Sequence, residues 1–326
     1  MAAGATGCGR RPAADGRPTI RIAFRPGLSM SGLYIAVEAG YFEEEGLDVT
    51  LIQFPNTPQI IPLLADGEVD VLPAGLNVAT INAVARGIRI RIVAGREVAS
   101  DSCGEANTLY ASARQFPNGI QDLRQLKGKR VSIRSRQTSA EFALDTLLST
   151  VGMTAGDVEL VFLRQADGAA ALLSGRIDAL VSSHFENNPD AVSGEYTKGL
   201  GLADILPGHQ RSFTMFGPSL LEGDRETGVR VLLAYLRGAN DFLNGRTAKA
   251  IDELARASGA DPAAARNGCR ATFVPDGAID RASVERTIAW AHRKGYSPRQ
   301  IQADDIIDSS FVQEAWRRFQ ERNAVG

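Results

Sequence analysis

Apolar and polar residues alternate at the start of the folded part of the chain. Ile20, Ile22 and Phe24 are separated by polar or small residues, which is the pattern of a half-buried strand. The segment 25–31 that follows is rich in Gly, Pro and Ser. We therefore predict a strand over 19–24 that ends in a polar loop.

A helix and a second strand follow this loop. From Gly32 the apolar residues recur at helical spacing, and the helix is predicted to stop at Gly40. Gly46 then turns the chain into an apolar strand over 47–54. This order makes a βαβ unit, whose parallel strands place the polar loop at the carboxyl edge of a sheet. Open α/β sheets bind small ligands at that edge.

The alternation of strand, loop and helix continues toward the middle of the chain. Ile88, Ile90 and Ile92 alternate with Arg89 and Arg91, which predicts an edge or half-exposed strand. The further predicted elements are a helix closed by Gly67, a buried strand over 69–72, a helix after Asn77, a strand around Leu109, a strand over 131–134 and a helix over 140–152.

Two distant segments resemble each other. ADGEVDVLPAG at 65–75 and LSGRIDALVSS at 173–183 both run through a helix end, Gly, one residue, a β-branched residue, Asp and a short apolar strand that ends in small residues. Two α/β lobes of like construction are the simplest explanation. The alternative is that Gly-x-[Val/Ile]-Asp is only a common helix-to-strand turn.

The composition is that of an ordinary globular protein. The 326 residues suggest two domains, and 44% hydrophobic with 23% charged residues is enough for a full core in each. A net charge of −2 gives no support to nucleic-acid binding. Cys8, Cys103 and Cys269 lie far apart and form no CxxC pair, so no structural zinc or iron–sulfur site is expected and at most one disulfide can form.

Residues 1–18 are small, polar and proline-containing, and we expect them to form a disordered leader. The tetrapeptide that ends at Cys8 resembles the tail of a bacterial lipoprotein signal, in which small residues precede an acylated Cys. It departs from that pattern at Ala5, where Leu is usual, and in lacking a hydrophobic run. A lipid anchor on Cys8 and a tail without a role both remain open.

Four segments together resemble a known family. They are YIAVEAGYFEEEGLDVTL, LLADGEVDVLPAG, LRQLKGKRVSIRSRQTS and ALLSGRIDALVSS. In this order they resemble the solute-binding proteins of nitrate/sulfonate/taurine and thiamine-pyrimidine ABC importers. The resemblance implies an α/β fold of the two-lobed type II periplasmic-binding class, in which each lobe is a mostly parallel sheet flanked by helices. A C-terminal helical segment would pack on lobe one.

The resemblance also implies a domain organisation. Lobe one would comprise 19–112 plus 212–326, and lobe two would be inserted as 113–211, with a hinge near 109–112 and 213–217. Such proteins are usually monomers that act in the periplasm or on the outer face of the membrane. They close around a small solute and deliver it to an ABC-transporter permease.

Candidate ligand-binding residues lie in loops that precede helices, because such loops offer unpaired backbone N–H groups and the positive end of a helix dipole. The segment 135–139 is the best of them, since it crowds donors ahead of a helix; capping of that helix by Thr138 or Ser139 is the alternative role. The predicted set is Arg25, Ser29, Met30, Ser31, Phe54, Asn56, Gly75, Asn77, Arg96, Ser135, Gln137, Thr138, Ser139, Ser183, His184, Phe185 and Glu186.

Two solute classes fit this set. Serines, Gln137 and the arginines favour a small organic anion such as a sulfonate or carboxylate, which is the prediction we prefer. A heteroaromatic solute such as a thiamine pyrimidine would instead use His184, Glu186 and Asn77. A stacking ring for it would come from Phe54, Phe185, Phe213 or Tyr110.

An enzyme on the same fold is the second class of function. Enzymes of thiamine and menaquinone biosynthesis share it, but the former carry a cysteine-rich run, whereas Cys103 stands alone here. Only His184, His209 and His292 supply imidazoles, and no catalytic triad pattern stands out. We therefore expect a binding protein without a cofactor or metal ion rather than an enzyme.

Overall fold

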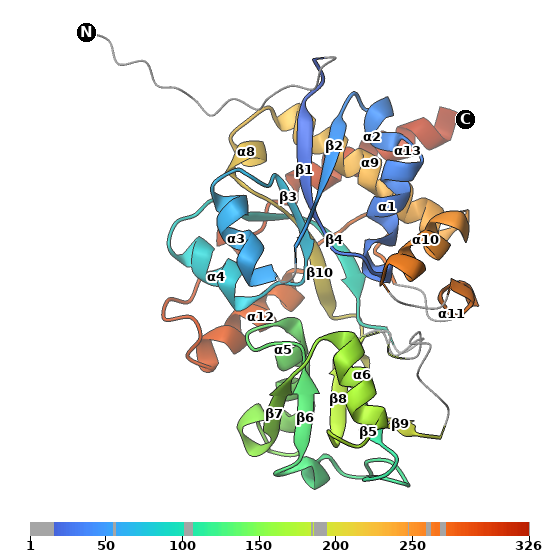
Figure 1. Ribbon diagram of the computed structural model, residues 1–326. Helices are drawn as coiled ribbons and strands as arrows, with labels where there is room; N and C mark the ends of the chain where they lie inside the picture. The colour runs from blue at the N-terminus through green and yellow to red at the C-terminus, as the bar shows by residue number, and fades with distance from the viewer. Residues whose placement is uncertain are drawn as a thin grey trace.

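The chain forms two lobes, each built on one five-stranded sheet (Figure 1). The structure is a computed structural model that describes residues 16–54, 57–100, 107–183, 185, 194–246, 248–258, 262–267 and 272–325. Helices flank both sheets, so the predicted two-lobed α/β fold is confirmed. Within the described residues, no helix has the length and apolar character needed to cross a membrane.

The first sheet has the strand order β2-β1-β3-β10-β4. β1 pairs in parallel with β2 and β3, whereas β10 is antiparallel to both of its neighbours, β3 and β4. The bounds of these strands are β1 Thr19–Phe24, β2 Asp48–Gln53, β3 Val71–Ala74, β4 Arg91–Val98 and β10 Gln210–Phe216.

The second sheet repeats this arrangement in the order β7-β6-β8-β5-β9. β6 pairs in parallel with β7 and β8, and β5 is antiparallel to β8 and β9. Its strands are β5 Thr108–Ser112, β6 Arg130–Ile133, β7 Glu159–Phe162, β8 Ala179–Ser182 and β9 Tyr196–Lys198.

The chain passes between the lobes twice, and each passage leads into a strand that runs antiparallel to its neighbours, β5 in the second sheet and β10 in the first. β5 lies in the second sheet although residues up to 112 were predicted to belong to lobe one, and β10 lies in the first sheet from Gln210 onward. Sheet membership thus places the two connections between Val98 and Thr108 and between Lys198 and Gln210. The hinge predicted near 109–112 and 213–217 falls within β5 and at the end of β10, and its position stays a prediction.

The helices surround the sheets as a periodic apolar pattern requires. On lobe one they are η1 Leu28–Met30, α1 Ser31–Glu38, α2 Tyr41–Glu44, α3 Thr57–Ala65, α4 Val78–Ala85, α8 Pro218–Leu221, α9 Arg225–Leu243, α10 Ala248–Ser258, α11 Pro262–Asn267, α12 Arg281–Arg293, η6 Ala303–Asp305 and α13 Ser310–Val325. On lobe two they are η3 Leu123–Leu126, α5 Ser139–Ser149, η4 Ala155–Asp157, α6 Gln165–Leu173 and α7 Leu202–Ile205.

Helix α1, which begins beside the predicted polar loop, packs tightly on α9. A Cβ atom added to Gly238 would lie only 2.2 Å from the carbonyl oxygen of Gly32 and 2.7 Å from the backbone nitrogen of Ala36. Only glycine allows this approach, so α9 fixes the start of α1 and the loop before it. The packing brings α1, α9 and α13 into one apolar cluster with β1.

Two strand predictions need correction. The strand predicted over 69–72 is observed as β3 over Val71–Ala74, and Asp70 just before it binds Arg21 with its side chain. β4 is an edge strand, which confirms one of the two predicted alternatives, but it begins only at Arg91, after Ile88 and Ile90, and its residues 92–97 are all buried. Chain segments from the C-terminal third cover it through the bridges Ile92 to Ile307 and Glu97 to Phe273.

The internal repeat predicted from the sequence is present in the two lobes in atomic detail. Arg21 Nε and Nη2 donate to Asp70 Oδ2 and Oδ1, each at 3.0 Å. Arg130 Nε and Nη2 donate to Asp178 Oδ2 and Oδ1 at 3.1 and 2.9 Å. In both lobes the arginine on the strand that pairs in parallel with two neighbours is thus held by the aspartate of the Gly-x-[Val/Ile]-Asp segment, so the repeat is more than a common turn.

The C-terminal segment also contacts lobe two. The indole nitrogen of Trp290 on α12 donates to Asp145 on α5 at 2.9 Å, and Lys294 Nζ lies 3.0 Å from the same carboxylate. The hydroxyl of Tyr296 donates to the buried carboxylate of Glu141 at 2.7 Å. One side of the gap between the lobes is therefore bridged by α5 and α12, which lie side by side (Figure 1).

Candidate functional site

The carboxyl ends of the parallel strands in the two lobes meet at one place. The backbone N–H of Val78, which begins α4 of lobe one, donates to the carbonyl of Gln137 of lobe two at 3.1 Å. A Cβ atom on Gly75 would lie 3.1 Å from the Arg211 carbonyl oxygen and 3.4 Å from Ser139 Oγ. We call this contact of 75–78 with 137–139 the interlobe junction.

The loop after β6 is ordered by its own polar groups. Gln137 has a left-handed backbone with φ 63°, and its N–H donates to Glu141 Oε2 at 2.6 Å. Thr138 occupies the N-cap position of α5, but its hydroxyl donates to the Ser135 carbonyl at 2.9 Å rather than accepting from the helix. The Thr138 side chain therefore does not cap α5, and the carboxylate of Glu141 instead binds the N–H one residue before the cap, while the side chain of Gln137 stays exposed.

Asn107 joins three parts of lobe two and was not predicted. Its side-chain nitrogen donates to the Ser139 carbonyl at 3.4 Å, and its N–H donates to Ser183 Oγ at 3.3 Å. Its φ of 52° is a left-handed value that Asn tolerates better than most residues. Asn107 therefore holds the predicted residues Ser139 and Ser183 in one cluster, and an Asn just before a strand was the available signal.

Arg25, the first residue after β1, lies half-buried at the carboxyl edge of lobe one. Its guanidinium carbon is 6.0 Å from the ring centre of Phe54. Burial, together with the positive charge of Arg134, lowers the pKa of Arg25 to about 10, while Glu97 acts in the opposite direction. Arg25 remains charged at neutral pH, and it lies close enough to lobe two to interact with Arg134.

Arg134 lies at the position of lobe two that matches Arg25, and it is not among the predicted residues because we assigned it to the strand. It is the first residue after β6 and is exposed to solvent. Desolvation by its surroundings nevertheless lowers its pKa. The repeated spacing Arg21-x-x-x-Arg25 and Arg130-x-x-x-Arg134 was the signal that could have identified it.

Arg96 lies behind the loop after β1. Its side chain is fully buried, and its guanidinium donates to the Ser29 carbonyl and, at 3.1 Å, to Ser212 Oγ. The guanidinium carbon also lies 5.8 Å from the ring centre of Tyr235. We therefore propose that Arg96 positions the loop and does not touch the solute. Met30 and Ser31 are likewise buried beneath the surface of this loop.

The aromatic side chains suggested for stacking belong to the core. Phe54 is 5% exposed, and Phe185, Phe213 and Tyr110 are 1%, 1% and 0% exposed. The rings of Phe185 and Tyr110 pack on each other, with their centres 4.5 Å apart. None of these four side chains presents a free ring face for a planar solute.

The side chain of Asn77 already makes hydrogen bonds within the protein. Its Oδ1 accepts from the N–H of Thr80 at 3.0 Å, which caps α4, and its Nδ2 donates to the Gly75 carbonyl at 3.3 Å. Asn77 therefore shapes the interlobe junction from within. The predicted residues Asn56, His184 and Glu186, and the lipidation candidate Cys8, lie outside the described residues.

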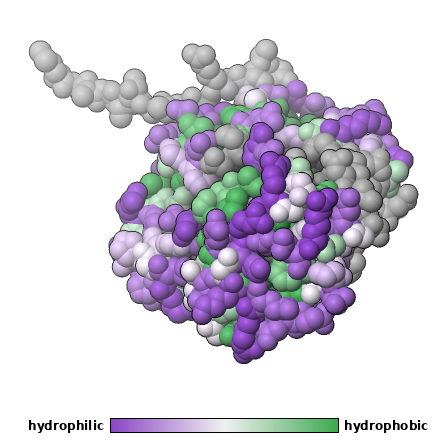
Figure 2. Space-filling view, turned by 60° about the horizontal axis from the view of Figure 1, so that its bottom comes forward, coloured by the Kyte–Doolittle hydropathy of each residue, from purple (hydrophilic) through white to green (hydrophobic). Residues whose placement is uncertain are grey.

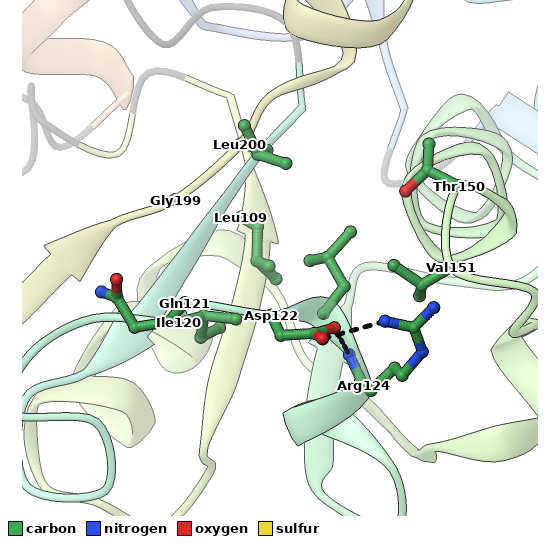
Figure 3. Close-up of a pocket in the computed structure, with 10 residues that line it drawn as sticks. Leu109, Ile120, Gln121, Asp122, Arg124, Thr150, Val151, Gly199 and Leu200 are labelled. Atoms are coloured by element: carbon green, nitrogen blue, oxygen red, sulfur yellow. Dashed lines mark hydrogen bonds and ion pairs between the residues drawn. The ribbon is translucent and has the colours of Figure 1, made fainter.

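The pocket in Figure 3 lies within lobe two and contains none of the predicted site residues. Its volume is about 230 Å³, and Leu109, Ile120 and Leu200 line it beside the ion pair of Asp122 with Arg124. A second hollow of about 720 Å³ lies between α9 and α13 and is lined mainly by charged side chains that pair with each other, such as Glu226 with Arg318. Neither lies at the interlobe junction.

The far end of lobe two carries mainly hydrophilic side chains, with smaller apolar areas between them (Figure 2). Phe162 and Leu200 are the large apolar residues of lobe two that are most exposed among those described, at 46% and 43%. Arg136 lies over the ring of Phe162 at 5.5 Å. Within the described residues, no group of three or more His, Cys, Asp or Glu is arranged to hold a metal ion.

Comparison with solved structures identifies the fold. The chain is similar to the periplasmic aliphatic sulphonate binding protein SsuA from Escherichia coli, with a TM-score of 0.71, 19% identity, and coverage of 89% of this chain and 92% of that one. It is also similar to the periplasmic nitrate-binding protein NrtA from Synechocystis, with a TM-score of 0.69, 12% identity, and 93% and 89% coverage. The desulfurization enzyme DSZB has the same fold, with a TM-score of 0.64, 13% identity, and 93% and 99% coverage.

Three sequence relatives cover about half of this chain or less. A Haemophilus influenzae protein named for thiamine biosynthesis is 28% identical over 48% of both chains. The formylaminopyrimidine-binding protein of Halalkalibacterium halodurans is 32% identical over 48% of this chain and 44% of its own. The 4-amino-5-hydroxymethyl-2-methylpyrimidine phosphate synthase of Schizosaccharomyces pombe is 27% identical over 45% and 39%. The chain thus spans about half the length of these relatives or less.

The match to a protein family covers more of this chain than the match to any of these three relatives. Residues 28–245 match the NMT1/THI5-like family, a range that includes the interlobe junction, Arg134 and all of lobe two, whereas Arg25 precedes it. This range, together with the periplasmic-binding fold, confirms the resemblance on which the predictions rest. The chain belongs to the NMT1/THI5-like family.

Proposed function

We propose that the protein is the solute-binding component of an ABC importer and captures a small organic anion between its two lobes. The observation that carries this proposal is the interlobe junction, where the carboxyl edges of two sheets meet beside Arg25. Carboxyl edges of open α/β sheets are the usual ligand sites of such folds. Two connecting segments join the lobes, so they can rotate to enclose a solute.

The polar groups at the junction favour an anion. Arg25 brings a positive charge, and Gln137 and Ser139 bring polar groups from the facing lobe. Guanidinium groups bind carboxylate and sulfonate oxygens through two parallel hydrogen bonds. The burial of Phe54 and Phe185 leaves these rings without a free face for stacking, which weighs against a heteroaromatic solute.

A pyrimidine solute is the second candidate, and a specific observation favours it. One relative is named as a formylaminopyrimidine-binding protein, and its 32% identity is the highest among the three relatives described above. A pyrimidine would have to be recognised through hydrogen bonds to its ring nitrogens and amino group rather than through the buried aromatic rings.

We further propose that the protein does not catalyse a reaction, although some related proteins are named as enzymes. The carboxylates described near the junction already have partners, since Glu97 pairs with Arg211 at 2.9 Å and Glu141 accepts from Tyr296 and Gln137. A general base needs a carboxylate that can reach its substrate.

The remaining parts of the proposal concern location and partners. A periplasmic-type binding fold supports action outside the cytoplasmic membrane, with an ABC-transporter permease as partner. We keep a monomer as the expected state and a lipid on Cys8 as a candidate anchor.

A thermal-shift screen tests the function. The purified protein is heated with sulfonates, nitrate, small carboxylates and thiamine pyrimidines, and each mixture is then analysed by mass spectrometry for consumed solute. A ligand at a hundredfold excess over its dissociation constant stabilises the native state by about 2.7 kcal/mol, which raises the melting temperature by several degrees. We expect a shift with anions and no turnover. A shift with pyrimidines alone would favour the second candidate, and turnover would refute the binding-protein assignment.

A further inference from the structure

The two lobes carry equivalent arginines at the edge where they meet. β1 and β6 occupy the same position in their sheets, second in the order and parallel to both neighbours. Arg21 and Arg130 mark corresponding points on these strands, because each binds the repeated aspartate of its own lobe. Arg25 and Arg134 each follow four residues later, as the first residue beyond the strand.

The same correspondence holds for the strand registers. Ile22, one residue after Arg21, pairs with Val71 in lobe one, and Val131, one residue after Arg130, pairs with Ala179 in lobe two. The repeat that builds each lobe therefore places an arginine at the carboxyl edge of each sheet, where the two lobes meet.

We propose that Arg25 and Arg134 grip one anionic group of the solute from opposite lobes, and that their mutual repulsion keeps the empty lobes from closing. This inference rests on the proposed function and extends it to the residues that couple binding to closure. An oxyanion with three oxygens, such as a sulfonate or phosphonate, suits this arrangement, because each guanidinium can bind different oxygens of one group.

The electrostatic surroundings support both halves of the proposal. Burial lowers the pKa of Arg25 most, and the positive charge of Arg134 lowers it further, so the two positive charges oppose each other where the lobes meet. Glu97 offsets this only in part, because its buried carboxylate also pairs with Arg211 at 2.9 Å. An anion between the two arginines would turn the repulsion into two attractions.

The first test is a binding comparison by calorimetry. Ethanesulfonate, benzenesulfonate, ethylphosphonate and propionate are titrated into the wild type, Arg25→Gln, Arg134→Gln and the control Arg124→Gln, with ethanesulfonamide as a neutral counterpart. Arg124 belongs to the same lobe as Arg134 but precedes β6, and its side chain is 65% exposed. We take the anion that the wild type binds most tightly. We expect Arg25→Gln and Arg134→Gln each to bind it about 10- to 100-fold more weakly than the wild type, and the control to bind it with wild-type affinity.

The second test measures the shape of the empty protein. Small-angle X-ray scattering of the ligand-free variants should give a smaller radius of gyration for Arg25→Gln and Arg134→Gln than for the wild type and Arg124→Gln. A purely structural role of these arginines would not make the empty protein more compact. Urea unfolding of the same variants verifies that they are folded.

The outcomes separate this inference from the proposed function. Equal anion affinity and equal ligand-free shape in all variants would overturn the arginine grip while leaving solute binding intact. Binding of ethanesulfonamide or a thiamine pyrimidine but of no anion by the wild type would overturn it as well. A wild type that binds no solute in either panel would refute the proposed function, and the inference would fall with it.

Discussion

Arg96 donates a hydrogen bond of 3.1 Å to the hydroxyl of Ser212, and so links the neighbouring strands β4 and β10. The same guanidinium also binds the Ser29 carbonyl in the loop after β1. A fully buried arginine thereby fixes the loop to two strands that flank the passage between the lobes. The loop can be rigid although it is rich in Gly and Ser.

Replacing Arg96 by leucine should loosen this loop. The substitution leaves the carbonyl of Ser29 without its donor, and each buried acceptor left unsatisfied costs about 1–3 kcal/mol. We expect a lower free energy of unfolding in urea and weaker solute binding, with an unchanged preference for charged over neutral solutes. Arg91→Leu on the same strand is the control, because Arg91 donates only to the adjacent Ile90 carbonyl among the described contacts. A lost charge preference in Arg96→Leu would indicate direct solute contact instead.

The repeated arginine–aspartate pairs should differ in their contribution to stability. Asp70 is fully buried and Arg21 31% exposed, whereas Asp178 and Arg130 are 7% and 38% exposed. Breaking a buried pair costs about 3–5 kcal/mol, and the cost falls with exposure. Asp70→Asn should therefore lower the free energy of unfolding more than Asp178→Asn does.

Urea unfolding of both variants verifies this order, with Asp122→Asn as the control because its pair with Arg124 is exposed. We expect the control to unfold as the wild type does. A larger loss for Asp178→Asn than for Asp70→Asn would contradict the argument from burial.

Gly75 should be required for the interlobe junction. A valine there places atoms against the Arg211 carbonyl and Ser139 Oγ, which a Cβ atom alone would already approach at 3.1 and 3.4 Å. Gly75→Val should weaken solute binding several-fold, because the junction can form only after its neighbours shift. Calorimetry against Gly156→Ala, whose Cβ would meet only Thr154 Oγ1 at 3.4 Å on lobe two, isolates the effect. An unchanged affinity in Gly75→Val would show that closure of the lobes around the solute does not depend on the junction.

His209 should make the protein less stable in acid. Burial and the charge of Arg286 lower its pKa from 6.5 to about 4, and its ring stacks on Phe142 at 4.9 Å. Because the folded pKa lies below the unfolded one, the unfolded state binds more protons between these values. The stability is complete above pH 6.5 and falls as the pH drops toward 4, by on the order of 2–3 kcal/mol.

Urea unfolding between neutral pH and pH 4 measures this loss, and His209→Gln should flatten that part of the profile. The variant is itself expected to be less stable at neutral pH, so the comparison is between slopes and not absolute values. The same slope in both proteins would assign the acid sensitivity to other groups.

Local patterns predicted much of the fold. The first strand, the helix before Gly40 and the Gly-x-[Val/Ile]-Asp repeat follow from residues near one another in the sequence, and the structure confirms them. The placement of Thr108–Ser112 was beyond this reasoning. A short strand buried on both faces looks the same whichever sheet it joins, so its partner depends on contacts remote in sequence.

The candidate site was harder to predict for a related reason. An arginine in a strand suggests a surface position, and only the distant Ser29, Ser212 and Tyr235 explain how Arg96 can be buried. Arg134 was assigned to its strand because the apolar pattern does not mark where the strand stops. Comparing the two repeats one residue at a time would have paired it with Arg25.

Small-angle X-ray scattering of the wild type, with and without the solute that gives the largest thermal shift, tests the central claim most directly. Capture of an anion between two lobes predicts that the radius of gyration decreases on binding and that the solute is recovered unchanged. A solute that raises the melting temperature without altering the radius of gyration, or that is consumed, would contradict the account.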